Sequence, residues 1–226
     1  GPFWRADSPP TPQGGSIVRS NTPGMPVFVD VQVHDASGQP VTDAEVDVWH
    51  SSSEGFYENQ DPGQADMNLR GKFVSDHEGR VRFRTIKPSG YPIPVSGPVG
   101  DLIKILGRHN MRPAHIHFMI SKPGYKTQFS QLYSSDDPHL ETDVQFGVTD
   151  KLIGRYVLHA DELAPDPDVQ GPWYSLQYRF VIETGLSRLP NPPIQGKASG
   201  DRPSGSDSGS PSMKPAASRS TPQCFT

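Results

Sequence analysis

The chain has 226 residues, enough for one packed domain with a tail, but only 33% of them are hydrophobic, while 25 are proline and 22 are glycine. The formal charge of -4 and the scattered Lys and Arg residues exclude a basic stripe for a phosphate backbone, so no nucleic-acid partner is expected. No apolar run approaches the roughly 20 residues that cross a bilayer, so no membrane span is expected either.

The only cysteine, Cys224, lies close to the end of the chain. An intramolecular disulfide is therefore excluded, and the fold must be held by its core or by a metal ion. This cysteine usage is compatible with a reducing compartment, and we expect a cytoplasmic location.

The first half of the chain reads as short strands joined by turns. Residues 1–26 are rich in Pro, Gly, Ser and Thr and predict an irregular segment. Valines alternate with other residues over 27–34, a pattern of period two that is typical of a strand, and a second strand is predicted at 44–50. A polar loop covers 51–71. Apolar runs on either side of the turn residues 76–79 then predict a β-hairpin formed by 73–74 and 81–86.

The second half continues in the same way. A loop with four prolines covers residues 88–100, and the apolar spacing over 101–107 predicts one or two helical turns. Further strands are predicted at 115–120, 128–133 and 174–182. Many short strands with few helices predict an all-β fold, an antiparallel β-sandwich with long functional loops.

The composition changes at residue 191. From there to residue 226 the chain consists mainly of Ser, Pro, Gly and charged residues, with almost no apolar surface to bury. Such a segment cannot offset the entropy of ordering, so we predict a disordered C-terminal tail at 191–226 after a catalytic β-sandwich domain at 1–190.

The strand at 115–120 carries two histidines two residues apart. Side chains alternate along a strand, so His115 and His117 share one face, whereas Ile116, Phe118 and Ile120 share the other. Two imidazoles on one face can bind a single metal ion. The alternative is a half-buried strand whose histidines only form hydrogen bonds.

Two tyrosines in glycine-rich loops are candidate metal ligands beside this histidine pair. Phenolate oxygens are hard ligands, and Tyr57 and Tyr91 together with two imidazoles favour Fe(III) over zinc or Fe(II). Taken singly, each tyrosine is better explained as a core or rim residue with a hydrogen-bonded hydroxyl.

Several runs of this sequence resemble one enzyme family. They are Trp-His-Ser-Ser-Ser-Glu-Gly-Phe-Tyr ending at Tyr57, Tyr-Pro-Ile-Pro beginning at Tyr91, and Arg-Pro-Ala-His-Ile-His beginning at Arg112. In this order they resemble the catalytic domain of the intradiol ring-cleavage dioxygenases, and the match extends from the first residues to about Ile182. Tyr-Pro-Ile-Pro, Phe118-Met119-Ile120 and the run 143–148 are most similar to the hydroxyquinol 1,2-dioxygenases.

The resemblance implies a β-sandwich that holds non-haem Fe(III) through Tyr57, Tyr91, His115 and His117. It places Arg112 and Gln131 at the reaction centre, where the arginine would also contact a small catecholic substrate that reacts with O2. It further implies a pocket wall that is formed by Gly1, Pro2, Phe3, Ile93 and Pro94. The implied reaction opens the ring of hydroxyquinol between adjacent hydroxyls, giving 3-hydroxy-cis,cis-muconate and then maleylacetate.

Three alternatives stay open at this stage. Catechol is the second candidate substrate, a non-catalytic β-sandwich binding module would hold no metal, and a zinc hydrolase lacks an obvious carboxylate base near the histidines. Members of the family carry a helical N-terminal segment that supplies part of the pocket and the dimer interface, and no such run is present in these residues. A homodimer is therefore expected only if the native protein is longer than this chain.

Overall fold

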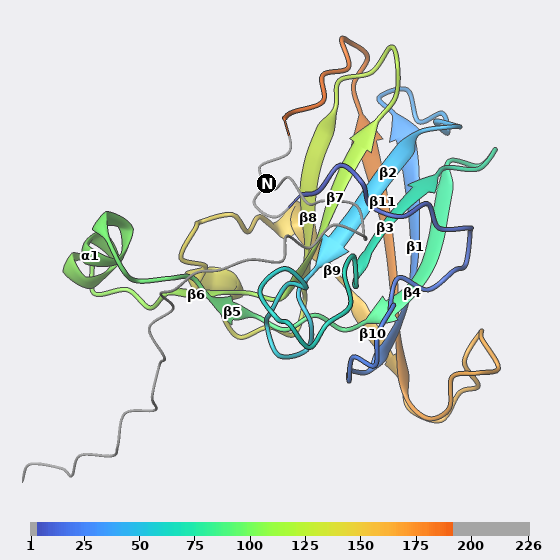
Figure 1. Ribbon diagram of the computed structural model, residues 1–226. Helices are drawn as coiled ribbons and strands as arrows, with labels where there is room; N and C mark the ends of the chain where they lie inside the picture. The colour runs from blue at the N-terminus through green and yellow to red at the C-terminus, as the bar shows by residue number, and fades with distance from the viewer. Residues whose placement is uncertain (1–3, 192–226) are drawn as a thin grey trace, which may run out of the picture. The chain divides into compact units, whose positions relative to one another are not determined.

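The computed structural model describes residues 4–191, which form two β-sheets packed against each other (Figure 1). The predictions for Gly1, Pro2 and Phe3 lie outside the described residues. The same is true of the predicted tail beyond residue 191, so the proposed domain boundary stays a prediction.

The first sheet has four strands, in the order β10 (Tyr156–His159), β11 (Trp173–Ile182), β1 (Pro26–Asp35) and β4 (Arg80–Ile86). The pairs β10–β11 and β1–β4 are antiparallel, as expected. The pair β1–β11 is parallel, and it joins the beginning and the end of the domain at the centre of this sheet.

The second sheet has five strands, in the order β3 (Arg70–Val74), β2 (Glu45–His50), β7 (His115–Ser121), β8 (Gln128–Ser134) and β9 (Ile153–Gly154). All neighbouring pairs are antiparallel except β8–β9. The histidine strand β7 is the central strand of this sheet, so its backbone is paired on both sides.

The core fills the space between the sheets. Every second residue of β1 is buried there, from Val27 to Val33, and these valines pack with inward residues of the other sheet such as Val46 and Phe118. Alternation along each strand puts one set of side chains into this layer. The predicted β-sandwich is confirmed.

The predicted hairpin is wrong. The turn is present, because Asp76 N donates to Arg80 O and Gly79 has a φ of 70° that suits glycine. The two strands, however, separate into different sheets, with β3 paired to β2 and β4 paired to β1. Phe73 and Phe83 instead stack across the core, with ring centroids 5.0 Å apart. The connection therefore crosses between the layers.

Shorter elements lie between β4 and β11. The two-residue strands β5 (Tyr91–Pro92) and β6 (Met111–Arg112) pair with each other and lead into and out of α1 (Pro98–Ile105). The 3-10 helices η1 (Leu140–Thr142) and η2 (Asp150–Leu152) follow β8. The helix begins three residues before the predicted turns because Pro98 occupies its first turn, where proline is favoured.

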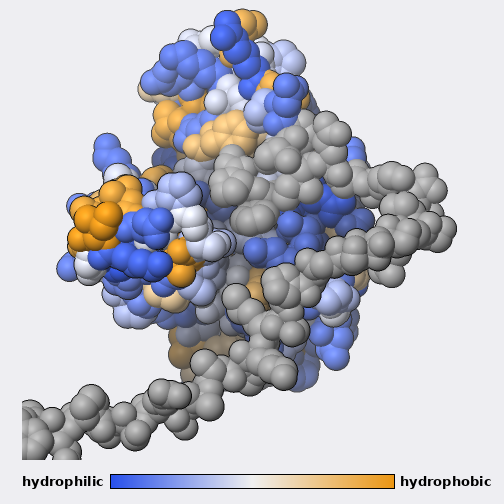
Figure 2. Space-filling view, turned by 60° about the vertical axis from the view of Figure 1, so that its left-hand side comes forward, coloured by the Kyte–Doolittle hydropathy of each residue, from blue (hydrophilic) through white to orange (hydrophobic). Residues whose placement is uncertain are grey.

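The α1 lobe stands away from the two sheets in Figure 1. Figure 2 shows hydrophobic residues gathered on the surface of this lobe, where Val99, Leu102 and Ile105 are exposed. Within residues 4–191, no helix has the length and apolar character needed to cross a membrane.

Candidate metal centre

Strand β7 directs two imidazoles away from the sandwich core. Ile116, Phe118 and Ile120 belong to the core between the sheets, as predicted, and His115 and His117 point to the opposite face. That face is also buried, because the exposed fractions of the two histidines are only 1% and 2%. Trp49 of the neighbouring strand β2 stacks on His117, with ring centroids 4.9 Å apart and planes 4° from parallel.

Two loops bring tyrosines over this face. Tyr57 lies in the loop between β2 and β3 and is completely buried, whereas Tyr91 begins β5 and is half-buried. The loops approach closely at Gly55, where φ is 83° and an added Cβ would lie 3.0 Å from Tyr91 Cβ. Glycine at this position therefore permits both the turn and the close approach of the two loops.

The four predicted ligand atoms form a closed ring of short distances. Tyr57 Oη lies 3.0 Å from His117 Nε2 and 3.3 Å from Tyr91 Oη. His115 Nε2 lies 3.1 Å from His117 Nε2 and 3.4 Å from Tyr91 Oη. Atoms bound to one ion at about 2.0–2.1 Å would lie about 3.3 Å from one another in a tetrahedral arrangement. The separations therefore fit a single ion among the four atoms.

The chemistry of the four groups also fits a hard trivalent ion. Among the described residues, no cluster of three His, Cys, Asp or Glu side chains could bind a metal ion, so such a site depends on its tyrosines. Two phenolates would neutralise two of the three charges of Fe(III), and imidazole is a good iron ligand. The residues present are thus suited to ferric iron.

Burial sets the protonation states of these groups. Burial, together with the nearby charge of Arg112, lowers the pKa of His115 to about 3, and burial lowers the pKa of His117 well below its ordinary value. Both imidazoles are therefore neutral. Burial also raises the pKa of Tyr57 well above its ordinary value, so this phenol keeps its proton until a cation replaces it.

Arg112 lies beside the ring of ligand atoms. Arg112 pairs with Tyr91 across strands β5 and β6, and its Nη1 lies 3.4 Å from His115 Nε2. Arg112 Nη2 donates to Gln131 Oε1 and to Tyr133 Oη, at 3.0 Å in each case. The structure thus brings Arg112 and Gln131 together with the four tyrosine and histidine atoms.

Two further residues hold the guanidinium and were not predicted to do so. Asp143 is 3% exposed, and its carboxylate lies 3.4 Å from Arg112 Nε. Tyr133 donates to Gln131 Oε1 at 2.5 Å while it accepts from Arg112. Tyr133 follows Gln131 by two residues on a predicted strand, so alternation already placed both side chains on one face. Asp143 comes from a distant loop and had no such signal.

The predicted pocket residues Ile93 and Pro94 lie just after β5. Ile93 is half-buried and exchanges hydrogen bonds with Asn110, whereas Pro94 is exposed. These contacts fix the path of the chain from Tyr91 into α1.

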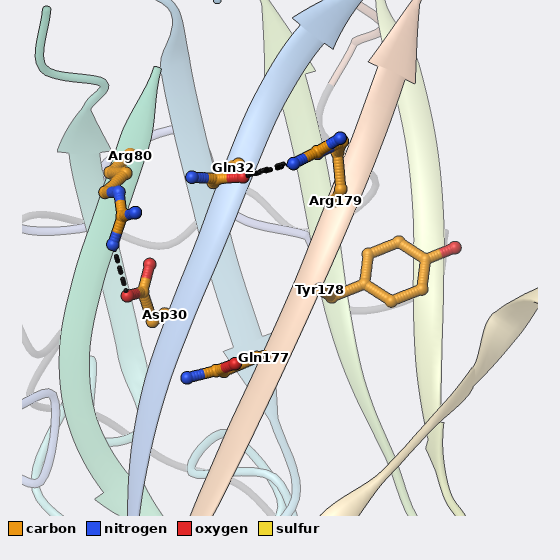
Figure 3. A pocket seen from close by; sticks show the side chains of 6 residues that line it. All are labelled: Asp30, Gln32, Arg80, Gln177, Tyr178 and Arg179. Carbon is orange, nitrogen blue, oxygen red and sulfur yellow. Dashed lines mark hydrogen bonds and ion pairs between the residues drawn. The ribbon is translucent and has the colours of Figure 1, made fainter. Parts of the chain in front are cut away.

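A cavity of about 280 Å³ opens beside the four-atom cluster. Its lining includes Trp49, Arg112, His117, Gln131, Tyr133 and Gln145. A larger hollow of about 490 Å³ lies on the outer face of the four-stranded sheet, shown in Figure 3. There Arg80 pairs with Asp30 at 3.0 Å and Arg179 donates to Gln32 at 3.1 Å. That hollow contains no imidazole, so the smaller cavity is the better candidate for a reaction site.

Comparison with known proteins finds clear relatives of this chain. Residues 1–184 match the family described as "Dioxygenase". The chain is 40% identical over 191 residues to the catechol 1,2-dioxygenase of Candida albicans, covering 83% of this chain and 62% of that protein. It is 40% identical over 185 residues to the hydroxyquinol 1,2-dioxygenase of Rhizobium sp., covering 80% of this chain and 62% of that protein.

Solved structures show the same similarity. Hydroxyquinol 1,2-dioxygenase from Pseudomonas putida DLL-E4 superimposes with a TM-score of 0.74 at 38% identity, covering 82% of this chain and 65% of that one. Catechol 1,2-dioxygenase from Pseudomonas arvilla C-1 gives a TM-score of 0.74 at 37% identity, covering 81% and 60%. The chain thus spans 62% of the length of each of the two curated relatives above.

Proposed function

The chain belongs to the intradiol ring-cleavage dioxygenases, and from this membership we propose that it cleaves the ring of hydroxyquinol between adjacent hydroxyls. O2 supplies two oxygen atoms, one carbon–carbon bond breaks, and the product is 3-hydroxy-cis,cis-muconate, which tautomerises to maleylacetate. The observation that carries this proposal is the ring of four ligand atoms at separations of 3.0 to 3.4 Å, with Arg112 beside it.

Tyr57, Tyr91, His115 and His117 would hold one non-haem ferric ion. When bound, Fe(III) draws electron density from a catecholic substrate and so prepares its ring for attack on O2. The neutral imidazoles present lone pairs to the ion without the loss of a proton. The phenols must each lose one.

The two tyrosines differ in their freedom to accept a proton from the substrate. Tyr57 is fully buried and touches both His117 and Tyr91, whereas Tyr91 is only half-buried. Tyr91 can therefore turn out of the cluster with less loss of packing. We assign to Tyr91 the acceptance of one of the two hydroxyl protons of the substrate.

Arg112 would stabilise negative charge on the substrate ring as it reacts. Its guanidinium is permanently charged, buried, and lines the cavity beside the ligand atoms. Asp143, Gln131 and Tyr133 hold it in place. Water exclusion by the surrounding Trp49 and Tyr133 strengthens the effect of this charge.

The choice of hydroxyquinol over catechol rests on the Tyr-Pro-Ile-Pro run at Tyr91 and on the relative from Rhizobium. Catechol is the second candidate, because the relative from Candida albicans bears that name at the same identity. Both substrates offer two adjacent hydroxyls. They differ by one ring hydroxyl, which Ile93 and Pro94 or the residues before Trp4 would have to recognise.

The test is to purify the chain from iron-replete cells, measure its iron content and visible spectrum, and follow oxygen uptake with hydroxyquinol and with catechol. We expect one iron per chain, a tyrosinate-to-iron colour band, and faster uptake with hydroxyquinol. Faster uptake with catechol would reverse the substrate assignment. A colourless, metal-free or zinc-containing protein without uptake would support a binding module or a hydrolase instead.

A further inference from the structure

A buried carboxylate directly follows Tyr57 in the chain. The side chain of Glu58 is 1% exposed, and its Oε1 accepts from Arg5 Nη1 at 2.9 Å and from Arg70 Nε at 2.8 Å. Arg5 belongs to the segment before β1, and Arg70 begins β3, where its backbone pairs with that of Trp49. Glu58 therefore ties the loop that carries Tyr57 to two separate parts of the sandwich.

Stability alone is a weak explanation for this buried group of charges. A buried ion pair often contributes no more to stability than apolar side chains of the same volume, because both charges lose their hydration. Glu58 Oε2 is moreover buried without a hydrogen-bond partner among residues 4–191. The carboxylate does lie next to a candidate metal ligand, and there it can act on the position of that ligand.

The backbone transmits this anchor to Tyr57. The planar peptide bond between Tyr57 and Glu58 keeps their Cα atoms about 3.8 Å apart, so fixing one residue restricts the other. The N–H of Tyr57 donates to Gln60 Oε1 at 3.0 Å, and its carbonyl oxygen accepts from Gln60 N at 2.9 Å. Trp4, which precedes Arg5, packs in the same apolar cluster as Tyr57. Trp4 and Arg5 thus hold the ring and the backbone of one tyrosine.

The end of the same loop is held in a strained conformation. Met67 and Leu69 have positive φ values of 60° and 58°, which such residues keep only where their surroundings fix them. Asn68 lies between them and is fully buried. Its side-chain oxygen accepts from Arg19 N at 2.7 Å, and its amide donates to Gln64 Oε1 at 2.9 Å. Backbone strain of this kind gathers at functional sites, where a defined position of the chain is needed.

Tyr91 has no comparable anchor beside it in the chain. Its neighbours are Gly90, which has no side chain, and Pro92, which has neither a charge nor an N–H group. The backbone of Tyr91 pairs with Arg112 across the two-residue strands β5 and β6. This difference matches the roles proposed above, in which Tyr57 stays in the cluster and Tyr91 turns out of it.

We propose that Glu58 is a positioning residue, and that its two arginine partners hold it so that the phenol of Tyr57 stays among the ligand atoms. This inference rests on the proposed function, and it adds the reason why one tyrosine stays while the other can leave. Ligand atoms must be held within about 0.5 Å of their working positions. Two charge-assisted hydrogen bonds to one buried oxygen supply such a restraint, because they are short and directional.

The test compares Glu58→Ala with Glu58→Gln and with the control Asp66→Ala. The two variants at position 58 lose the same charge, but glutamine keeps an oxygen that can accept from both arginines. Asp66 is the other carboxylate on Arg5, at 2.6 Å from Nη1, and it is 45% exposed and farther along the loop from Tyr57. Its variant controls for the loss of a carboxylate beside Arg5.

Two quantities are measured on each protein, under conditions in which urea unfolding shows that it is fully folded. They are the affinity for Fe(III), by competition with nitrilotriacetate, and the visible absorbance per bound iron. We expect Glu58→Ala to bind Fe(III) about 10- to 100-fold less tightly than Glu58→Gln, the usual range for groups that orient ligands. Absorbance per iron should fall toward that of Tyr57→Phe in Glu58→Ala alone, and Asp66→Ala should keep the wild-type affinity.

A double-mutant cycle links the effect to Tyr57. In a Tyr57→Phe background no phenol is left to position, so Glu58→Ala should not lower the Fe(III) affinity further. In a Tyr91→Phe background the full loss should remain. Should Glu58→Ala not fold, Glu58→Met combined with Arg70→Met replaces it in the cycle, because apolar side chains of similar volume often restore the stability lost with a buried pair.

Equal Fe(III) affinities of Glu58→Ala and Glu58→Gln would overturn the positioning role. The same conclusion follows if Glu58→Ala costs as much affinity in the Tyr57→Phe background as in the wild type, or if Asp66→Ala loses as much as Glu58→Ala. Each of these results, in a protein whose wild type binds iron and opens the ring, rejects only this inference. A wild type that binds no iron rejects the proposed function itself.

Discussion

Substitutions in the buried pair of Arg112 and Asp143 can distinguish a structural role of the arginine from a catalytic one. Both side chains are 2% exposed, and the Nε–Oδ1 distance is 3.4 Å. Arg112→Met would leave the Asp143 carboxylate buried with only the backbone N–H groups of Gln145 and Gly147 as donors. Breaking a buried pair in this way costs about 3–5 kcal/mol of the free energy of unfolding.

Asp143→Asn in the same molecule should restore most of this loss, because the uncompensated charge disappears. Turnover should not return, since the charge that faces the reacting ring is still missing. Losing such a charge typically slows turnover by about two to three orders of magnitude. Stability and catalysis would thus respond differently to the second substitution.

Urea unfolding of the metal-free proteins, followed by tryptophan fluorescence, measures the first quantity, and single-turnover ring opening measures the second. Arg80→Met is the control, because its pair with Asp30 is roughly one-third exposed on the outer sheet and should contribute at most about 1 kcal/mol. If Arg112→Met is no more destabilising than Arg80→Met, the buried pair does not act as argued here. If the double variant regains turnover, Arg112 only balances Asp143.

Three further outcomes follow from the site and its surroundings. Tyr57→Phe and Tyr91→Phe should each remove part of the visible band of the iron-loaded protein. Tyr125→Phe, at a distant position against the core, is the control and should leave the band unchanged. Equal spectra for all three variants would refute the ligand assignment. Burial raises the pKa of Asp47 to about 7, so the stability due to its protonated form is complete below about pH 4 and is lost as the pH rises through 7. Asp47→Asn should remove this decline, which amounts to up to about 4 kcal/mol, and unfolding curves at pH 5 and 8 test it. Gly147→Ala would place a Cβ 2.5 Å from Tyr133 Oη, so turnover should fall while iron content is kept; unchanged turnover would show that the Tyr133 hydroxyl can move freely.

The alternation of residues along a strand predicted which of its side chains face the core. The alternation over β7 correctly put Ile116 and Phe118 into the core and the two histidines on the opposite face. Alternation carries no information about which strands are neighbours. For this reason β3 and β4 were assigned to one hairpin, although Phe73 and Phe83 face each other across two sheets. The parallel pairing of β1 with β11 was beyond reach for the same reason.

The residues of the candidate metal centre could not be brought together by local patterns either. Tyr57, Tyr91 and the histidine pair come from three separate segments, and only the resemblance to a family joined them before the structure did. Tyr133 was within reach of simple counting, because it follows Gln131 by two residues on a predicted strand and therefore shares its face. Asp143 was not, since its position depends on the path of a loop without periodicity.

Burial on both faces of β7 ties the fold to the chemistry. The core covers one face, and the loops carrying Tyr57 and Tyr91 cover the other, so the imidazoles stay neutral and Tyr57 keeps its proton. The cluster therefore holds no uncompensated charge when no cation is bound. The same burial makes a cation necessary for the phenolate form, so the loops that shield the site also make its ionisation depend on the metal. Arg112, a permanent charge beside the cluster, needs Asp143 as a buried partner for the same reason.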